Sequence, residues 1–245
     1  LRNDPSGEHK GKTTKEILRS YKTYWITKND YVPIVKDMHE LFEREKISRK
    51  IVEDLFDGLE SDLEEKVKIK SKKDLLIYCY RVAGTVGLMM SKILNVKDKR
   101  ALKGAIDLGI AMQLTNIARD VIEDSKKNRE YIDPNFESIK KTLELADHFY
   151  NSSFTSIKKI PFSCRFGVLV ARRIYRQIGY KILSKKEMEN YKKSGKIYIN
   201  NLSKFFQTIL SLFDLVKLSF TTLEDHQGKE EHDIISEVIN LNERF

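Results

Sequence analysis

The chain has 245 residues, and its 45 Lys and Arg against 36 Asp and Glu give a formal net charge of +9 at pH 7. A hydrophobic content of 40% with 10% aromatic residues excludes a disordered chain. The longest apolar run, residues 82–90, is far shorter than the roughly 20 residues that span a bilayer. Only 4 Pro and 11 Gly interrupt the sequence, which predicts an all-α fold. The two cysteines favour a reducing compartment, the cytoplasm, over a disulfide framework.

Helical patterns follow one another along almost the whole chain. Residues 1–12 are polar and are predicted to form a tail or loop, and a helical pattern begins at Thr13. Pro33 suits the first turn of the next helix, and Ser48 is a candidate cap for the third. Later helices are expected over these ranges: 74–94, 98–124, 137–157, 164–184, 201–219 and 230–243. The basic segment 66–73, the loop 126–136 and the Lys-rich stretch 185–196 are expected to be irregular. Since no repeat or linker appears, residues 13–245 are predicted to be one helical domain.

Four oxygen-bearing side chains share one stripe of the helix expected over 98–124. Gln113, Asn116, Asp120 and Asp124 fall within an arc of roughly 80° at about 100° per residue. The other positions of this helix are mostly apolar, and buried carboxylates need a partner. Hard oxygen ligands suit Mg²⁺, which substrate phosphates commonly help to hold. The alternative is a solvent-facing polar stripe on an amphipathic helix.

Two glycines interrupt the apolar helix expected upstream of that stripe. Gly84 and Gly87 each destabilise a helix by about 1 kcal/mol relative to Ala, so a favourable interaction must offset this cost. Small residues would let a ligand chain lie against the backbone or let the helix kink, or they would permit tight packing of two helices. Arg81, Arg119 and Arg129 are candidate partners for a diphosphate, although each alone suits an ordinary salt bridge.

Two long motifs carry a family resemblance. YCYRVAGTVG, which begins at Tyr78, and LGIAMQLTNIARDVIED, which ends at Asp124, resemble the squalene/phytoene synthases, and the finer sequence is closer to bacterial phytoene synthase. DGLESDL (57–63), NREYI (128–132) and ARRIY (171–175) resemble further segments of that family. The resemblance covers roughly residues 15–215. It implies the isoprenoid synthase fold, an all-helical domain with a central apolar cavity.

The same resemblance implies roles for individual side chains. Those that match the metal-binding motif, for Mg²⁺ or Mn²⁺, are Asn116, Asp120 and Asp124. Implied catalytic residues are Asp120, Asp124, Tyr78 and Tyr175. Implied substrate-binding residues are Asp62, Val82, Gly87, Gln113, Arg119 and Arg129. Of these, the positions that match the wall of the prenyl pocket are Tyr78, Val82 and Gly87.

The implied activity is a prenyl transfer in carotenoid biosynthesis. Two geranylgeranyl diphosphates would be joined head to head through a cyclopropyl diphosphate to give phytoene. One alternative is a squalene or dehydrosqualene synthase that uses farnesyl diphosphate. Another is a non-catalytic member that assists the assembly of a complex. No nucleic-acid motif appears, so a nucleic-acid binder is the weakest alternative.

The sequence departs from the family in one respect. The family also has a first Asp-rich motif near its N-terminus, and here the nearest candidates, Asp4 and Asp30, stand alone. With Leu1 in place of an initiating Met, this favours a fragment whose missing motif precedes Leu1. We therefore expect little or no activity from this chain by itself, and robust phytoene formation would contradict that expectation.

Two smaller expectations concern basic residues and histidines. The Lys-rich stretch 185–196 is a candidate for peripheral contact with anionic lipid on the inner face of a membrane, with a solvated loop as the alternative. The five histidines show no spacing typical of metal ligands.

Overall fold

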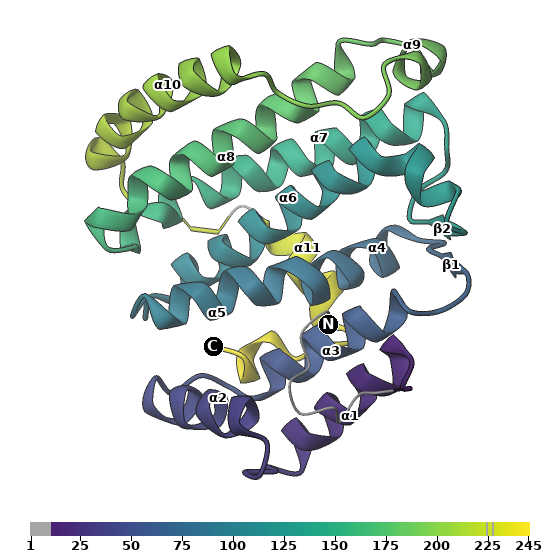
Figure 1. The fold of residues 1–245 in the computed structure, drawn as a ribbon. Helices are drawn as coiled ribbons and strands as arrows, with labels where there is room; N and C mark the ends of the chain where they lie inside the picture. The colour runs from purple at the N-terminus through teal and green to yellow at the C-terminus, as the bar shows by residue number, and fades with distance from the viewer. Residues whose placement is uncertain (1–10, 224, 227) are drawn as a thin grey trace.

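Helices make up nearly all of the regular structure in the computed structural model, which describes residues 11–223, 225, 226 and 228–245 (Figure 1). In chain order the elements are α1 (Thr14–Ile26), α2 (Pro33–Arg44), α3 (Lys50–Ser61), β1 (Val67–Lys68), α4 (Lys72–Cys79), the π-helix η1 (Tyr80–Gly84), α5 (Thr85–Ile93), α6 (Lys99–Ser125), β2 (Arg129–Glu130), α7 (Phe136–Ser153), the 3₁₀-helix η2 (Thr155–Lys159), α8 (Phe162–Leu183), α9 (Met188–Lys193), α10 (Asn201–Phe220), α11 (Lys229–Ser236) and the 3₁₀-helix η3 (Leu241–Glu243). The predicted all-α fold is confirmed. None of the helices in the described part combines the length and apolarity needed to cross a bilayer.

The helix starts follow local capping chemistry in most cases. Thr13 and Glu16 form a capping box at the start of α1, and Pro33 occupies the first turn of α2. Asp98 accepts a hydrogen bond from the backbone N–H of Arg100 and so caps α6. The prediction for Ser48 is wrong, because α3 begins at Lys50 with no side-chain cap. The tail predicted over residues 1–12 lies mostly outside the described residues.

The single helix expected over residues 74–94 is divided into three parts. α4 ends at Cys79, one π-helical segment covers Tyr80 to Gly84, and α5 then continues to Ile93. A π-helical turn has i→i+5 hydrogen bonds in place of the i→i+4 bonds of an α-helix. The wider turn changes the direction of the side chains that follow it. The motif identified in the sequence therefore spans a change of helical register.

Close packing of helices explains one of the two glycines. A Cβ atom at Gly87 would lie 2.2 Å from the carbonyl oxygen of Ala105 on α6, and one at Gly109 would lie 2.3 Å from that of Ala83. Glycines on both helices therefore permit the close approach of the α5 segment and α6. Of the explanations left open by the sequence, tight helix packing applies at Gly87.

Two segments expected to be irregular contain regular structure. β1 pairs in parallel with β2, and Val67 donates its backbone N–H to Asn128 while Ile69 donates to Glu130, each at 3.0 Å. In the Lys-rich stretch, α9 forms because its Tyr191 is buried at 3% exposure against the α6–α8 region. Both features depend on contacts with segments distant in the sequence, and the local residue pattern does not indicate them.

α6 is the central helix of the molecule. It lies between α5 and the pair formed by α7 and α8, and α10 covers the outer side of α8 (Figure 1). Fully buried side chains of α6, including Ile106, Ile110 and Leu114, form the middle of the main apolar core. The polar stripe of this helix is therefore held on a rigid, buried support.

Candidate active site

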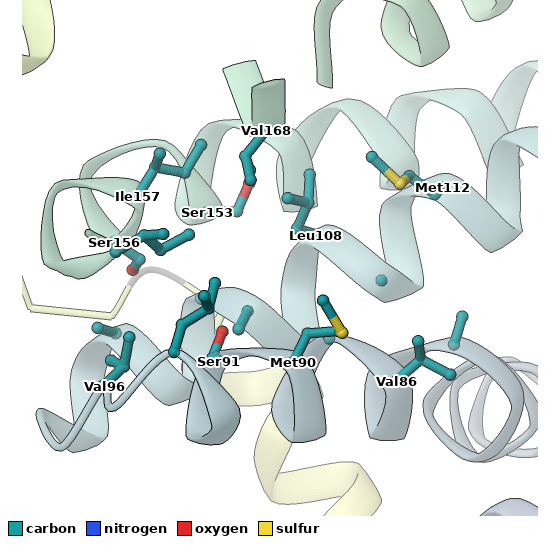
Figure 2. A pocket seen from close by; sticks show the side chains of 18 of the residues that line it. Val86, Met90, Ser91, Val96, Leu108, Met112, Ser153, Ser156, Ile157 and Val168 are labelled. Carbon is teal, nitrogen blue, oxygen red and sulfur yellow. The ribbon is translucent and has the colours of Figure 1, made fainter. Parts of the chain in front are cut away.

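An apolar cavity of about 370 Å³ lies beside α6. Side chains of the α5 segment, such as Val86 and Met90, face Leu108 and Met112 of α6 across it, and Ile157 of η2 closes another side (Figure 2). Its volume falls within the range of about 300–1,000 Å³ typical of small-molecule pockets. The central apolar cavity that the resemblance implies is therefore present beside this helix.

The polar stripe reaches this cavity at one end. Gln113 and Asn116 line it together with Val82 and Gly87. The side-chain Oδ1 of Asn116 is buried and has no hydrogen-bond partner among the described residues. An unpaired buried acceptor is costly, so this oxygen is available to a ligand or cation.

Asp120 lies one turn further along α6 and is fully paired. Arg119 donates two hydrogen bonds to its carboxylate, at 2.9 Å and 2.6 Å, and Lys196 Nζ lies 3.3 Å from Oδ1. Burial raises the pKa of Asp120, but these two cations more than offset it and bring the pKa below its ordinary value. The carboxylate is therefore ionised and neutralised by the protein itself.

Asp124 is in the opposite situation. Its carboxylate makes no hydrogen bond or ion pair with any residue that the structure describes, and it lines a narrow crevice with Arg129 and Tyr131. Burial, and then the charge of Asp120, raise the pKa of Asp124 above its ordinary value. A carboxylate destabilised in this way gains most from a nearby cation.

These residues fit a hard divalent cation. Asn116 and Asp124 offer oxygen atoms that the protein leaves unpaired. They are eight residues apart on α6, a rise of about 12 Å, so they suit two separate ions rather than one. Mg²⁺ prefers oxygen ligands and keeps several waters. The carboxylate of Asp120 could also bind a cation only if Arg119 and Lys196 move away from it or leave one of its oxygens free. The metal role of the three residues stays a prediction.

A second polar cluster surrounds Asp62, at the end of α3. The hydroxyl of Tyr78 lies 2.9 Å from its Oδ1, and the hydroxyl of Tyr131 lies 2.7 Å from the same oxygen. Arg129 donates to the backbone oxygen of Asp62 at 2.8 Å, and the two tyrosine rings stack at 4.8 Å. Tyr78 thus contacts Asp62 and does not line the apolar cavity, unlike Val82.

Two further residues, Tyr131 and Lys196, show what local patterns missed. Tyr131 lies in the NREYI segment, but only the fold brings its hydroxyl to Asp62. Lys196 contacts the stripe through Asp120 and also pairs with Glu123 at 2.9 Å, so it is not simply solvated. Tyr175, which was predicted from the sequence, is half-buried on α8 and interacts electrostatically with Arg119. Its predicted catalytic role stays a prediction.

Comparison with known proteins agrees with this geometry. The sequence profile of the family described as Squalene/phytoene synthase matches residues 11–135, more than half of the chain. The chain belongs to the squalene/phytoene synthase family.

Curated relatives are named phytoene synthase. The chain is 33% identical over 157 residues to the phytoene synthase of Pseudescherichia vulneris, which covers 56% of this chain and 50% of that protein. It is 35% identical over 147 residues to the 15-cis-phytoene synthase of Enterobacter agglomerans, which covers 51% of this chain and 50% of the relative. The chain thus spans about half the length of these relatives.

A solved structure supports the fold. The crystal structure of a dehydrosqualene synthase in complex with a ligand superposes with a TM-score of 0.68 at 23% identity, over 86% of this chain and 82% of the other. The isoprenoid synthase fold expected from the sequence is confirmed.

Proposed function

We propose that this chain supplies the diphosphate-binding side of a prenyl transferase that joins two geranylgeranyl diphosphates head to head to give phytoene. The observation that carries the proposal is the position of the polar stripe. Gln113 and Asn116 lie where the apolar cavity meets the stripe that continues to Asp120 and Asp124. A prenyl chain needs an apolar pocket and its diphosphate needs cations, and this junction offers both.

The chain's own residues have distinct tasks in this proposal. Val82 and Gly87 would contact the prenyl chain, while Asn116 and Asp124 would each hold a separate Mg²⁺ ion. When bound, Mg²⁺ neutralises the charge of the departing diphosphate. Arg119 and Lys196, now paired with Asp120, would supply further positive charge to diphosphate oxygens. The cavity would exclude water from the carbocations that the family's chemistry requires.

The similarity to proteins named phytoene synthase favours geranylgeranyl over farnesyl diphosphate. A farnesyl-specific squalene or dehydrosqualene synthase remains the second candidate, because a dehydrosqualene synthase shares the fold. Competition between the two prenyl diphosphates for the chain, and the chain length of any product by mass spectrometry, separate the two candidates.

Binding of a non-ionising substrate analogue tests the proposal directly. We expect geranylgeranyl thiolodiphosphate to bind the chain in the presence of Mg²⁺ and to lose at least about tenfold in affinity when Mg²⁺ is removed, which corresponds to about 1.4 kcal/mol. Asp124→Asn should weaken the Mg²⁺ dependence, because the unpaired carboxylate of the stripe loses its charge. Calorimetric titration measures both effects.

Glu144→Gln is the matched control. Glu144 is an exposed acidic residue on α7 whose ion-pair partner among the described residues is Lys140 on the same helix, so its substitution changes the net charge without touching the stripe. Equal binding with and without Mg²⁺, or an Asp124→Asn variant that behaves like Glu144→Gln, would contradict the proposed function.

A further inference from the structure

A second cluster of potential metal ligands surrounds Asp107, on another part of α6. Asp107 is fully buried, and two imidazoles approach its carboxylate: Nε2 of His226 lies 2.6 Å from Oδ2, and Nε2 of His232 lies 2.6 Å from Oδ1. Ser152 of α7 donates a further hydrogen bond to Oδ2. His226 lies in the connection after α10 and His232 lies on α11, so the cluster joins α6 to the C-terminal helix (Figure 1). The spacing of the histidines in the sequence gives no sign of this cluster, which the fold assembles.

The polar atoms of this cluster are only partly satisfied by the protein. Nδ1 of His226 and Nδ1 of His232 are both buried without a hydrogen-bond partner among the described residues. No Lys or Arg within the described ranges pairs with Asp107, and its carboxylate contacts the two imidazoles and Ser152.

We propose that Asp107, His226 and His232 form a binding site for a divalent transition metal, with Zn²⁺ as the best match. The three residues each offer one ligand atom, and these atoms lie within 4.8 Å of one another. One carboxylate and two imidazole nitrogens are a common set of protein ligands for Zn²⁺, whereas Mg²⁺ prefers oxygen alone.

The distances allow a metal after a small movement. Zn²⁺ bonds of about 2.0 Å in a tetrahedral arrangement place neighbouring ligand atoms about 3.3 Å apart. The present 2.6 Å separations would have to widen by less than about 1 Å. Ser152 Oγ or a water would complete the coordination.

Gly228 shapes the wall of the same site. A Cβ atom there would lie 3.0 Å from Cε1 of His226 and 3.4 Å from Oδ2 of Asp107. The absence of a side chain therefore leaves the space in which the imidazole of His226 can adjust toward a metal.

The proposed site is separate from the acidic stripe. Asp107 and Asp120 are thirteen residues apart on α6, which corresponds to about 20 Å along the helix. The two sites also differ in ligand chemistry. Success or failure of the Zn²⁺ proposal is therefore independent of the proposed prenyl transfer.

Titration with Co²⁺ in excess Mg²⁺ tests the site, because Co²⁺ reports a tetrahedral environment by its visible absorption and the excess Mg²⁺ competes for the oxygen ligands of the acidic stripe. We expect one Co²⁺ to bind per chain and Zn²⁺ to displace it. His226→Gln should weaken binding by more than about 100-fold, because loss of a direct ligand exceeds the 10–100-fold effect of an outer-shell partner. His148→Gln is the control, since His148 also contacts α11, through Glu231, but is half-exposed and outside the cluster.

Thermal unfolding gives a second readout that does not depend on Co²⁺ spectra. Zn²⁺ should raise the unfolding midpoint of the unmodified chain and of His148→Gln, but not that of His226→Gln. Circular dichroism of the metal-free variants establishes that each is folded. Absence of binding by the unmodified chain, equal binding by His226→Gln, or loss of binding in both variants would each overturn the proposal.

Discussion

Asp120 and Asp124 lie one turn apart on the same helix and experience opposite electrostatic environments. Arg119 and Lys196 pair with Asp120 and lower its pKa, whereas burial and the neighbouring charge of Asp120 raise the pKa of Asp124. The folded chain therefore favours the ionised form of one carboxyl group and disfavours that of the other. Such an unpaired carboxylate is typical of a functional position, because stability alone would not select it.

The two carboxyl groups should respond to pH with opposite signs. The pKa of Asp124 is raised on folding, so its ionisation destabilises the metal-free chain as pH rises, and Asp124→Asn should raise the unfolding midpoint at pH 7. The pKa of Asp120 is lowered, so its contribution to stability is present at neutral pH, and Asp120→Asn should lower the midpoint there.

Both changes in the unfolding midpoint should become smaller at acidic pH. Near pH 3, below the ordinary Asp pKa of about 3.9, the Asp124 side chain is protonated in either state and Asp124→Asn should give no gain. Thermal unfolding of each variant in chelator-treated buffer at the two pH values measures this. A loss of stability on Asp124→Asn at neutral pH would show that its carboxylate has a partner in solution.

At the scale of elements, the approach of α5 to α6 sets the shape of the cavity. Gly87 and Gly109 let the two backbones approach closely, and the apolar side chains on either side then line the cavity. The same glycine thus serves helix packing and lies at the cavity wall. The π-helical segment before α5 determines which of its side chains face that cavity.

Gly87→Ala should separate the two helices. The added Cβ would lie 2.2 Å from the carbonyl oxygen of Ala105, a backbone atom that cannot rotate away, and overpacking of this kind costs about 1–3 kcal/mol. Gly167→Ala on α8 is the control, because a Cβ there has nothing within 4 Å and a helical Ala should gain about 0.5–1 kcal/mol. Urea unfolding of both variants measures the contrast. Equal changes in the free energy of unfolding for the two variants would show that α5 and α6 are further apart in solution.

At the scale of the whole molecule, the C-terminal segment returns to the N-terminal helices. Arg244 donates two hydrogen bonds of 2.9 Å to the buried carboxylate of Asp54 on α3, which also accepts one from Tyr80 at 3.0 Å. The Asp107 cluster connects the same C-terminal segment to α6. Residues far apart in the sequence thus join α3 and α6 to the C-terminal segment.

Arg244→Ala should destabilise the whole fold. Its side chain is 11% exposed and that of Asp54 is 7% exposed, so the substitution leaves a buried carboxylate without its cation, at a cost of about 3 kcal/mol. Lys50→Ala is the control, since Lys50 pairs with the adjacent Glu243 at exposed positions, where a pair contributes less than about 1 kcal/mol. Urea unfolding compares the two, and an equally small loss in Arg244→Ala would mean that the Asp54 pair is solvated.

The sequence by itself determined the helices and the order of the polar residues along them. Periodicity and the scarcity of Pro and Gly are local properties, and α6 was predicted to within one residue at each end. The spacing of Asn116, Asp120 and Asp124 fixed a common stripe because helix geometry is nearly constant.

Only the tertiary structure decided which of those oxygens are free. Lys196 reaches Asp120 from 76 residues further along the chain, and His226 and His232 reach Asp107 across separations of 119 and 125 residues. Contacts of this range depend on how whole helices pack, and helix periodicity carries no information about them. The sequence therefore placed the residues on their helices, and the packing of those helices set their partners, their charge and the cavity they face.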